Sequence, residues 1–246
     1  SGNRDSGREK TIMKPLYVFR HIECEGPGYL GEVLARYGIP FEVYAIDRAA
    51  ALPDDTRNCS GLVLMGGPMS VNDPLPWIEQ ELALIRAAAD RQLPVLGHCL
   101  GGQLISKALG GEVTNNRVRE IGWHTVAKTA NPTAADWLDG QPDSMVLFHW
   151  HGETFSIPAG AEVLLENDTC AHQAFAIGNT LALQCHVEMQ APMVSEWAAL
   201  YQDEIRQPSA TVQSAGEMTR DLHERVRQAQ TVADALYARW LALLSD

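Results

Sequence analysis

The sequence predicts an α/β fold: a mostly parallel central sheet flanked by helices, with an antiparallel edge and a helical C-terminal extension. Short apolar runs alternate with helical patterns over the first hundred residues, as in a parallel sheet covered on both faces. From about Gly122 to Leu183, strand-like segments follow one another, punctuated by Gly, Pro and Asn. The remainder, Pro192–Leu244, has a helical pattern.

The parallel strands are expected at four apolar runs, Leu16–Phe19, Phe41–Tyr44, Gly61–Met65 and Pro94–Gly97. Helical spacing of apolar residues predicts three helices in the same part of the chain, Tyr29–Tyr37, Trp77–Arg91 and Gln103–Leu109.

The second half is expected to add the antiparallel edge, with strands at Met145–Phe148, Ala161–Leu165 and Thr180–Leu183. The C-terminal helical pattern carries a stripe of Leu, Val and Trp and is interrupted around Gln207–Ser209. We expect it to pack on the core or on another subunit, which permits a homodimer without establishing one.

A chain of 246 residues is compatible with one α/β core. Residues 1–12 lack an apolar pattern and are interpreted as a tag or tail, because Met13 directly precedes the first strand-like run. Residues 13–192 then form the principal domain, and 193–246 form the helical extension.

The composition excludes several function classes. The formal net charge is -12, and nucleic-acid affinity requires Lys and Arg to neutralise phosphates, so no nucleic-acid partner is expected. No apolar stretch approaches the roughly 20 residues that cross a bilayer, and the N-terminus is unlike a signal peptide. We therefore expect no membrane association and a cytoplasmic location.

The five cysteines favour neither a disulfide framework nor a zinc site, because they are odd in number and form no CxxC pair. The sequence also lacks a phosphate-binding loop and a dinucleotide fingerprint. We accordingly predict no metal and no cofactor.

One cysteine stands in a chemically distinctive context. Gly97–Gln103 follows a buried-strand pattern and opens a helix, which predicts a tight turn that projects Cys99 out of the sheet. A helix N-terminus favours the thiolate, and the N–H of Leu100 would face a developing oxyanion. The competing interpretation is a buried structural cysteine.

A thiol nucleophile needs a base, and Gln184–Glu188 supplies His186 and Glu188 two residues apart at the end of a strand-like run. Period-two spacing places both side chains on one face, so Glu188 can orient the imidazole that takes the proton from Cys99. Without the cysteine turn, an isolated His-x-Glu would more often be structural.

The third element is a glycine pair, Gly66 and Gly67, directly after a parallel-strand run. A loop at the carboxyl end of such a strand can present a backbone N–H to the active site. Gly67 is therefore expected to share the oxyanion hole with Leu100, and Gly66 to contact substrate.

These three elements, in this order and spacing, resemble the class I glutamine amidotransferase family over roughly Leu16 to Pro192. The resemblance implies that Cys99 attacks the side-chain amide of glutamine and that a γ-glutamyl thioester is then hydrolysed. It also implies that Gln103 helps to hold the glutamine, and that its amino-acid head contacts Trp150, Gly152 and Glu153 in the segment His149–Glu153.

The chain looks most like the stand-alone, GMP-synthase-like members, because no synthetase domain follows the His-x-Glu. The resemblance then implies either ammonia delivery to a separate synthetase subunit or γ-glutamyl peptidase activity on glutathione-like conjugates. Trp150 and Cys185 depart from the family pattern, and a larger leaving group would fit that departure. A non-catalytic binding protein of the same fold stays open, as does the intracellular protease and chaperone family, which the Gly-Gly-Pro loop and late His-x-Glu disfavour.

Overall fold

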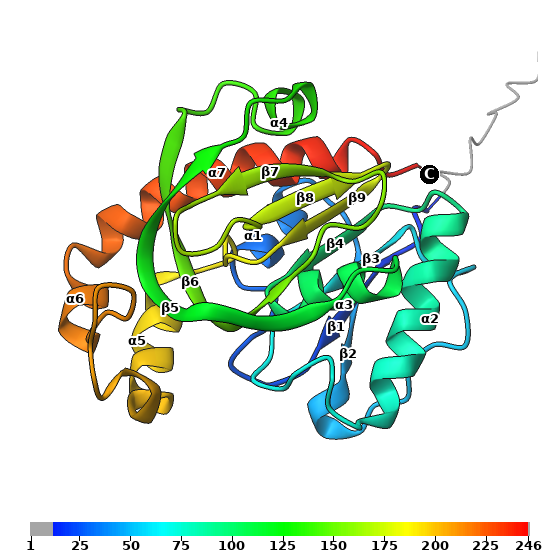
Figure 1. Ribbon diagram of the computed structural model, residues 1–246. Coiled ribbons are helices and arrows are strands. Elements are labelled where there is room, and N and C mark those ends of the chain that lie inside the picture. The colour runs from blue at the N-terminus through cyan, green and yellow to red at the C-terminus, as the bar shows by residue number, and fades with distance from the viewer. Residues whose placement is uncertain (1–11, 246) are drawn as a thin grey trace, which may run out of the picture.

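The computed structural model describes residues 12–245, and within them the chain forms one nine-stranded mixed sheet covered by helices (Figure 1). The strand order is β2-β1-β3-β4-β9-β8-β7-β5-β6. This architecture confirms the predicted fold class. The interpretation of residues 1–12 as a tag or tail lies, except for Ile12, outside the described residues.

Five adjacent strands form the parallel part of the sheet: β1 (Leu16–Arg20), β2 (Phe41–Ala45), β3 (Gly61–Leu64), β4 (Val95–His98) and β9 (Thr180–Leu183). The positions of all five were predicted within one or two residues, but β9 was expected in the antiparallel edge, whereas it pairs parallel with β4 and antiparallel with β8. In β1, β3, β4 and β9 the residues alternate between two apolar clusters, as the pleat of a strand requires. Val18 packs with α1 (Tyr29–Arg36), and Phe19 packs with α2 (Pro76–Asp90) on the opposite face.

The antiparallel edge consists of β8 (Ala174–Ile177), β7 (Glu162–Glu166), β5 (Val113–Lys128) and β6 (Ser144–Phe155). The prediction placed the start of this region at Gly122, whereas β5 begins at Val113. The error has a physical cause: the first half of β5 is largely exposed and polar, so it carries little apolar periodicity. Strand β8 and the short helix α4 (Pro132–Trp137) were also missed.

The C-terminal extension packs on the core. It comprises α5 (Ala191–Leu200), the 3-10 helix η2 (Gln202–Ile205), α6 (Ala215–Thr219) and α7 (Leu222–Leu241), and a second 3-10 helix, η1 (Ile46–Arg48), follows β2. Helix α7 is tied to β4, because Trp240 Nε1 donates to the Val95 carbonyl over 3.1 Å. The break between α5 and α6 is longer than predicted. No helix in the described part of the chain is long and apolar enough to cross a membrane.

The topology brings four loops to one edge of the sheet. Strands β1, β3, β4 and β9 are neighbours and run parallel, so the loops after them meet at their carboxyl ends. Strand β6 curls back to the same place, where the His186 N–H donates to the Phe148 carbonyl over 2.8 Å. A site at this edge can therefore draw residues from five separate segments.

Candidate active site

Cys99 occupies the sharp turn between β4 and helix α3 (Leu100–Ala108). Its backbone has φ 52 and ψ -107, a conformation that residues with a side chain rarely adopt. Such strain persists only where the surroundings enforce it, and it is typical of functional sites. The Cys99 N–H donates to the Leu183 carbonyl over 2.8 Å, which ties the turn to β9.

The glycines after the cysteine allow α3 to start directly against the sheet. A Cβ on Gly101 would lie 2.1 Å from the Leu64 carbonyl oxygen, and one on Gly102 would lie 2.5 Å from that of Leu183. Neither position accepts a side chain without moving backbone. The glycines therefore set how closely the helix N-terminus, with its free N–H groups, approaches the strand ends.

His186 and Glu188 form a buried pair, with His186 Nδ1 3.0 Å and 3.1 Å from the two carboxylate oxygens of Glu188. The other ring nitrogen, Nε2, is buried and has no hydrogen-bond partner among the described residues. The two residues lie outside any regular strand, yet their side chains meet as the spacing predicted.

The electrostatics of the pair favour a charged imidazole. Burial by itself lowers the pKa of His186, but the neighbouring Glu188 and Cys99 outweigh it and raise that pKa well above its ordinary value. Burial likewise works to raise the pKa of Glu188, and His186 reverses this so that the net shift is downward. Cys99 thus lies within the electrostatic reach of a base whose tautomer is fixed by a carboxylate.

The Gly66-Gly67 loop lies beside the cysteine turn. A Cβ on Gly67 would be 3.0 Å from Leu100 Cδ2, so the two residues are neighbours. The hydrogen bonds of residues 12–245 include none donated by the N–H of Gly67 or of Leu100. Gly66 is buried behind the pocket, since its Cβ would collide with Glu25 Oε1 at 2.4 Å.

A second buried His–Glu pair, absent from the sequence predictions, supports this loop. His21 Nδ1 donates to the Met65 carbonyl over 2.9 Å, and Nε2 donates to Glu81 over 2.9 Å. Since both ring nitrogens face acceptors, both carry hydrogen and the ring is a cation. Burial lowers the pKa of His21, but Glu81 more than compensates, and the net shift is upward.

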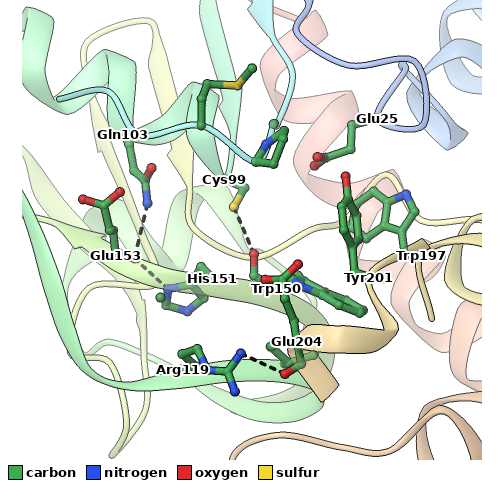
Figure 2. A pocket seen from close by; sticks show the side chains of 15 residues that line it. Glu25, Cys99, Gln103, Arg119, Trp150, His151, Glu153, Trp197, Tyr201 and Glu204 are labelled. Carbon is green, nitrogen blue, oxygen red and sulfur yellow. Dashed lines mark hydrogen bonds between the residues drawn. The ribbon is translucent and has the colours of Figure 1, made fainter. Parts of the chain in front are cut away.

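A pocket opens over Cys99, which lies between two groups of side chains (Figure 2). On one side are Gln103, His151 and Glu153, with Gln103 Nε2 donating to the Glu153 carbonyl over 3.3 Å. The backbone carbonyl of Trp150 is 3.5 Å from Cys99 Sγ, and Gly152 lines the same cavity. The structure therefore brings together at Cys99 the substrate-contact residues that the sequence suggested, except Gly66.

The family model described as "Glutamine amidotransferase class-I" matches residues 29–193. The chain belongs to this family. The match covers the cysteine turn, the Gly-Gly-Pro loop and the His-x-Glu pair, and it ends where the C-terminal helices begin.

Comparison with individual class I glutamine amidotransferases agrees. The glutamine amidotransferase-like protein YfeJ of Salmonella typhimurium is 31% identical over 180 residues, covering 68% of this chain and 74% of that protein. The crystal structure of a glutamine amido transferase from Methylobacillus flagellatus has a TM-score of 0.92 and 45% identity, over 95% of this chain and 96% of that one. The glutamine-hydrolyzing GMP synthase of Leifsonia xyli is 36% identical, but this chain spans only 26% of its length.

Behind the side of the pocket that carries Gln103 and Glu153 lies a polar cluster around Glu120. Glu120 Oε1 accepts hydrogen bonds from His151 Nε2 and Gln173 Nε2, and Oε2 accepts from Asn167 and Thr169. Burial raises the pKa of Glu120, but the adjacent histidines outweigh it and hold that pKa far below its usual range. Glu120, His149 and His151 are also close enough to hold a metal ion. The hydrogen bonds that Glu120 accepts give the cluster a structural role, since they hold His151 in place.

On the other side of Cys99, the loop after β1 contributes Glu25, which the sequence analysis overlooked. Glu25 is 5% exposed and lines the pocket together with Trp197 and Tyr201 of the C-terminal extension (Figure 2). Burial raises the pKa of Glu25 to about 7. The sequence did contain an indication of this role, because Glu25 follows a correctly predicted parallel strand. Loops at the carboxyl ends of such strands often line binding sites.

Proposed function

We propose that this class I glutamine amidotransferase hydrolyses the side-chain amide of glutamine through a γ-glutamyl thioester on Cys99, with His186 and Glu188 completing a catalytic triad. The observation that carries the proposal is the arrangement at the carboxyl edge of the sheet: a strained cysteine turn beside a buried imidazole whose Nδ1 is held by a carboxylate at 3.0 Å.

The first half-reaction follows from these groups. His186 Nε2 holds the proton that came from the thiol, so Cys99 Sγ attacks the amide carbon as a thiolate, and the carbonyl oxygen becomes an oxyanion. The unpaired N–H groups of Gly67 and Leu100 are suited to stabilise this oxyanion. The C–N bond then breaks, and His186 returns the proton to the departing nitrogen, which leaves as ammonia.

In the second half-reaction water attacks the thioester. His186 accepts a proton from the water, the C–S bond breaks, and glutamate leaves while Cys99 recovers its proton. Glu188 stays ionised throughout and holds the imidazole in the required tautomer. Gln103, the backbone of Trp150, Gly152 and Glu153 are proposed to hold the amino-acid head of the substrate, and Gly66 leaves room for the Glu25 carboxyl group.

The ammonia acceptor is proposed to be a separate synthetase subunit. The similarity to the glutamine-hydrolyzing GMP synthase of Leifsonia xyli supports a synthetase as the ammonia acceptor. A second candidate is hydrolysis of γ-glutamyl amides that release an amine. It is favoured by one observation: the pocket continues past Cys99 to Glu25 and Tyr201, which leaves space for a leaving group larger than ammonia.

The test is glutamate release from glutamine and from a panel of γ-glutamyl amides. We expect glutamate release by the wild-type protein, and we expect Cys99→Ala to abolish it. Cys59→Ala, which removes a buried thiol remote from the pocket, should not reduce the release. Glutamate release that persists in Cys99→Ala would contradict the mechanism. Absence of release from every γ-glutamyl compound, with the folded protein and with candidate synthetases added, would contradict the function.

A further inference from the structure

The pocket beyond Cys99 ends in an acidic and aromatic surface. Its members are the carboxylates Glu25 and Glu204 and the rings of Trp150, Trp197 and Tyr201. We call these five residues the distal end of the pocket. They come from the loop after β1, from β6 and from the C-terminal helices, so the distal end exists only in the folded chain.

Glu25 is the member that points to a ligand. Its side chain is aimed into the pocket (Figure 2), it is 5% exposed, and its carboxyl group accepts no hydrogen bond from any residue in the described range. The carboxyl oxygens of Glu25 are open to the pocket, where only solvent or a ligand can donate to them, and burying a carboxyl group this deeply without a donor from the protein is costly. A ligand that donates hydrogen bonds or brings positive charge would remove that cost.

The aromatic residues of the distal end pack on one another at steep angles. Trp150 meets Trp197 edge to face with centroids 6.3 Å apart, and it meets Tyr201 at 5.5 Å and 54°. Trp150 Nε1 also donates to Glu204 Oε1 over 3.4 Å, which holds that carboxylate at the rim. Aromatic rings and carboxylates both attract cations, so a pocket end that combines them suits an ammonium group.

A cation already lies at the rim of the pocket, between Gly152 and the backbone of Glu204. The Arg119 stem lies beside Gly152, with Cγ 3.5 Å from the place of a Gly152 Cβ, and its guanidinium donates to the backbone carbonyl of Glu204 over 2.8 Å. It therefore does not pair with the Glu204 carboxylate or with Glu25. Arg119 instead suits the α-carboxylate of a γ-glutamyl head.

The position of Glu25 relates it to the leaving group. The place of a Cβ on Gly66 is 2.4 Å from Glu25 Oε1 and 3.2 Å from His186 Cε1, so the carboxyl lies close to the imidazole. His186 is the group that delivers a proton to the departing nitrogen in the proposed mechanism. The distal end is therefore on the leaving-group side of Cys99, opposite Gln103 and Glu153.

We propose that the distal end is a subsite for a positively charged leaving group, so that the enzyme prefers γ-glutamyl amides of diamines to those of neutral amines or of amino acids. The inference rests on the proposed Cys99-dependent hydrolysis and specifies its substrate class. The bonds that form and break are unchanged: the amide C–N bond breaks, and the amine leaves with the proton from His186. Anionic leaving groups, such as the peptide part of glutathione, are disfavoured by the two carboxylates.

The experiment compares three amides of similar size at pH 8: γ-glutamyl-2-aminoethylamide, γ-glutamylpropylamide and γ-glutamylglycine. These place an ammonium, a methyl and a carboxylate at the same position. We expect kcat/KM for the aminoethylamide to exceed that for the propylamide by on the order of tenfold, with γ-glutamylglycine slowest. In Glu25→Gln, kcat/KM for the aminoethylamide should exceed that for the propylamide by a factor of only about 1 to 3.

The matched control is Glu23→Gln, the same change two residues away in the same loop. Glu23 is exposed and pairs with Arg48 over 3.2 Å, so the substrate ratio should stay at the wild-type value. A wild-type ratio near one, or an equal loss of ratio in both variants, overturns the subsite while the amidase activity stands.

A binding measurement keeps the two proposals separable. Calorimetric titration of the Cys99→Ala protein should show tighter binding of the aminoethylamide than of the propylamide, also by on the order of tenfold. Equal affinities overturn the subsite. If the aminoethylamide binds more tightly but no γ-glutamyl compound is hydrolysed by the intact protein, the subsite stands as a binding site and the proposed hydrolysis is overturned.

Discussion

His21 Nε2 lies 2.9 Å from both carboxylate oxygens of Glu81, in a pair whose side chains are wholly buried. The same imidazole donates through Nδ1 to the Met65 carbonyl, so the pair connects α2 to the loop that carries Gly67. Trp77, one helical turn before Glu81, stacks on the ring with centroids 4.9 Å apart. A buried cation thus fixes the backbone on which the proposed oxyanion hole depends.

Glu81→Gln should lower the free energy of unfolding by about 3–5 kcal/mol, because it leaves the His21 cation buried without a counter-charge. Urea denaturation measures this. The control is Glu79→Gln in the same helix, where the side chain is exposed and a loss below about 1 kcal/mol is expected. Equal losses in the two variants would contradict a buried ion pair.

The pair should also make stability depend on pH. The pKa of His21 is raised in the folded protein, so its contribution is fully present below about 6.5, the unfolded value. The contribution is lost as pH rises through the higher folded pKa. We expect the wild-type unfolding free energy to fall with pH above about 6.5, and the fall to be shallower in His21→Asn, whose amide can still donate to Met65. Parallel curves for the two proteins would refute this.

Sequence reasoning reached the parts of the site that depend on local pattern. A strand, a tight glycine-rich turn and a helix predicted the geometry at Cys99, and two-residue spacing predicted that His186 and Glu188 meet. It missed His21 and Glu81, which are 60 positions apart, because only the packing of α2 on the sheet brings them together. Contacts of that kind leave no local signature.

The errors in the predicted fold have the same cause. The polar first half of β5 resembles a loop in sequence, and it forms a strand because β6 offers a partner for its backbone. The C-terminal extension was predicted as helical, but its contribution of Trp197 and Tyr201 to the pocket could not be read from a pattern of apolar spacing. In both cases the outcome depends on tertiary contacts, which local sequence patterns do not record.

Glu188→Gln should reduce kcat for glutamate release by on the order of 10³–10⁴-fold, because the amide can donate to Nδ1 and stabilise the wrong tautomer of His186. The rates are measured under saturating glutamine. Glu196→Gln, an exposed change in α5, should retain wild-type kcat. A kcat of Glu188→Gln within about tenfold of the wild-type value would show that Glu188 is not part of the triad.

Thiol alkylation should distinguish Cys99 from the other four cysteines. Burial raises the pKa of Cys59, Cys170 and Cys185, which protects them as thiols. Burial also raises the pKa of Cys24, although this residue is partly accessible. We expect iodoacetamide to modify Cys99 first, at the helix N-terminus beside His186, as read by peptide mass spectrometry. Faster labelling of Cys24 would show that Cys99 is not activated.

The preference for a cationic leaving group should strengthen as pH rises. The pKa of Glu25 is about 7, raised chiefly by burial, with His186 and His21 opposing and Glu188 and Glu204 reinforcing the shift. Below that pH the carboxyl is neutral and attracts a cation weakly, whereas above it the charge is fully present.

The ratio of kcat/KM for the aminoethylamide to that for the propylamide isolates this ionisation. The pH dependence of the catalytic steps is common to both substrates and cancels in the ratio, and the leaving-group ammonium stays protonated over the range measured. Between about pH 6 and 8, which brackets the pKa of Glu25, the wild-type ratio should rise several-fold. In Glu25→Gln it should be flat and low, because no charge develops at that position. A flat ratio in the wild type would mean that Glu25 does not face the leaving group.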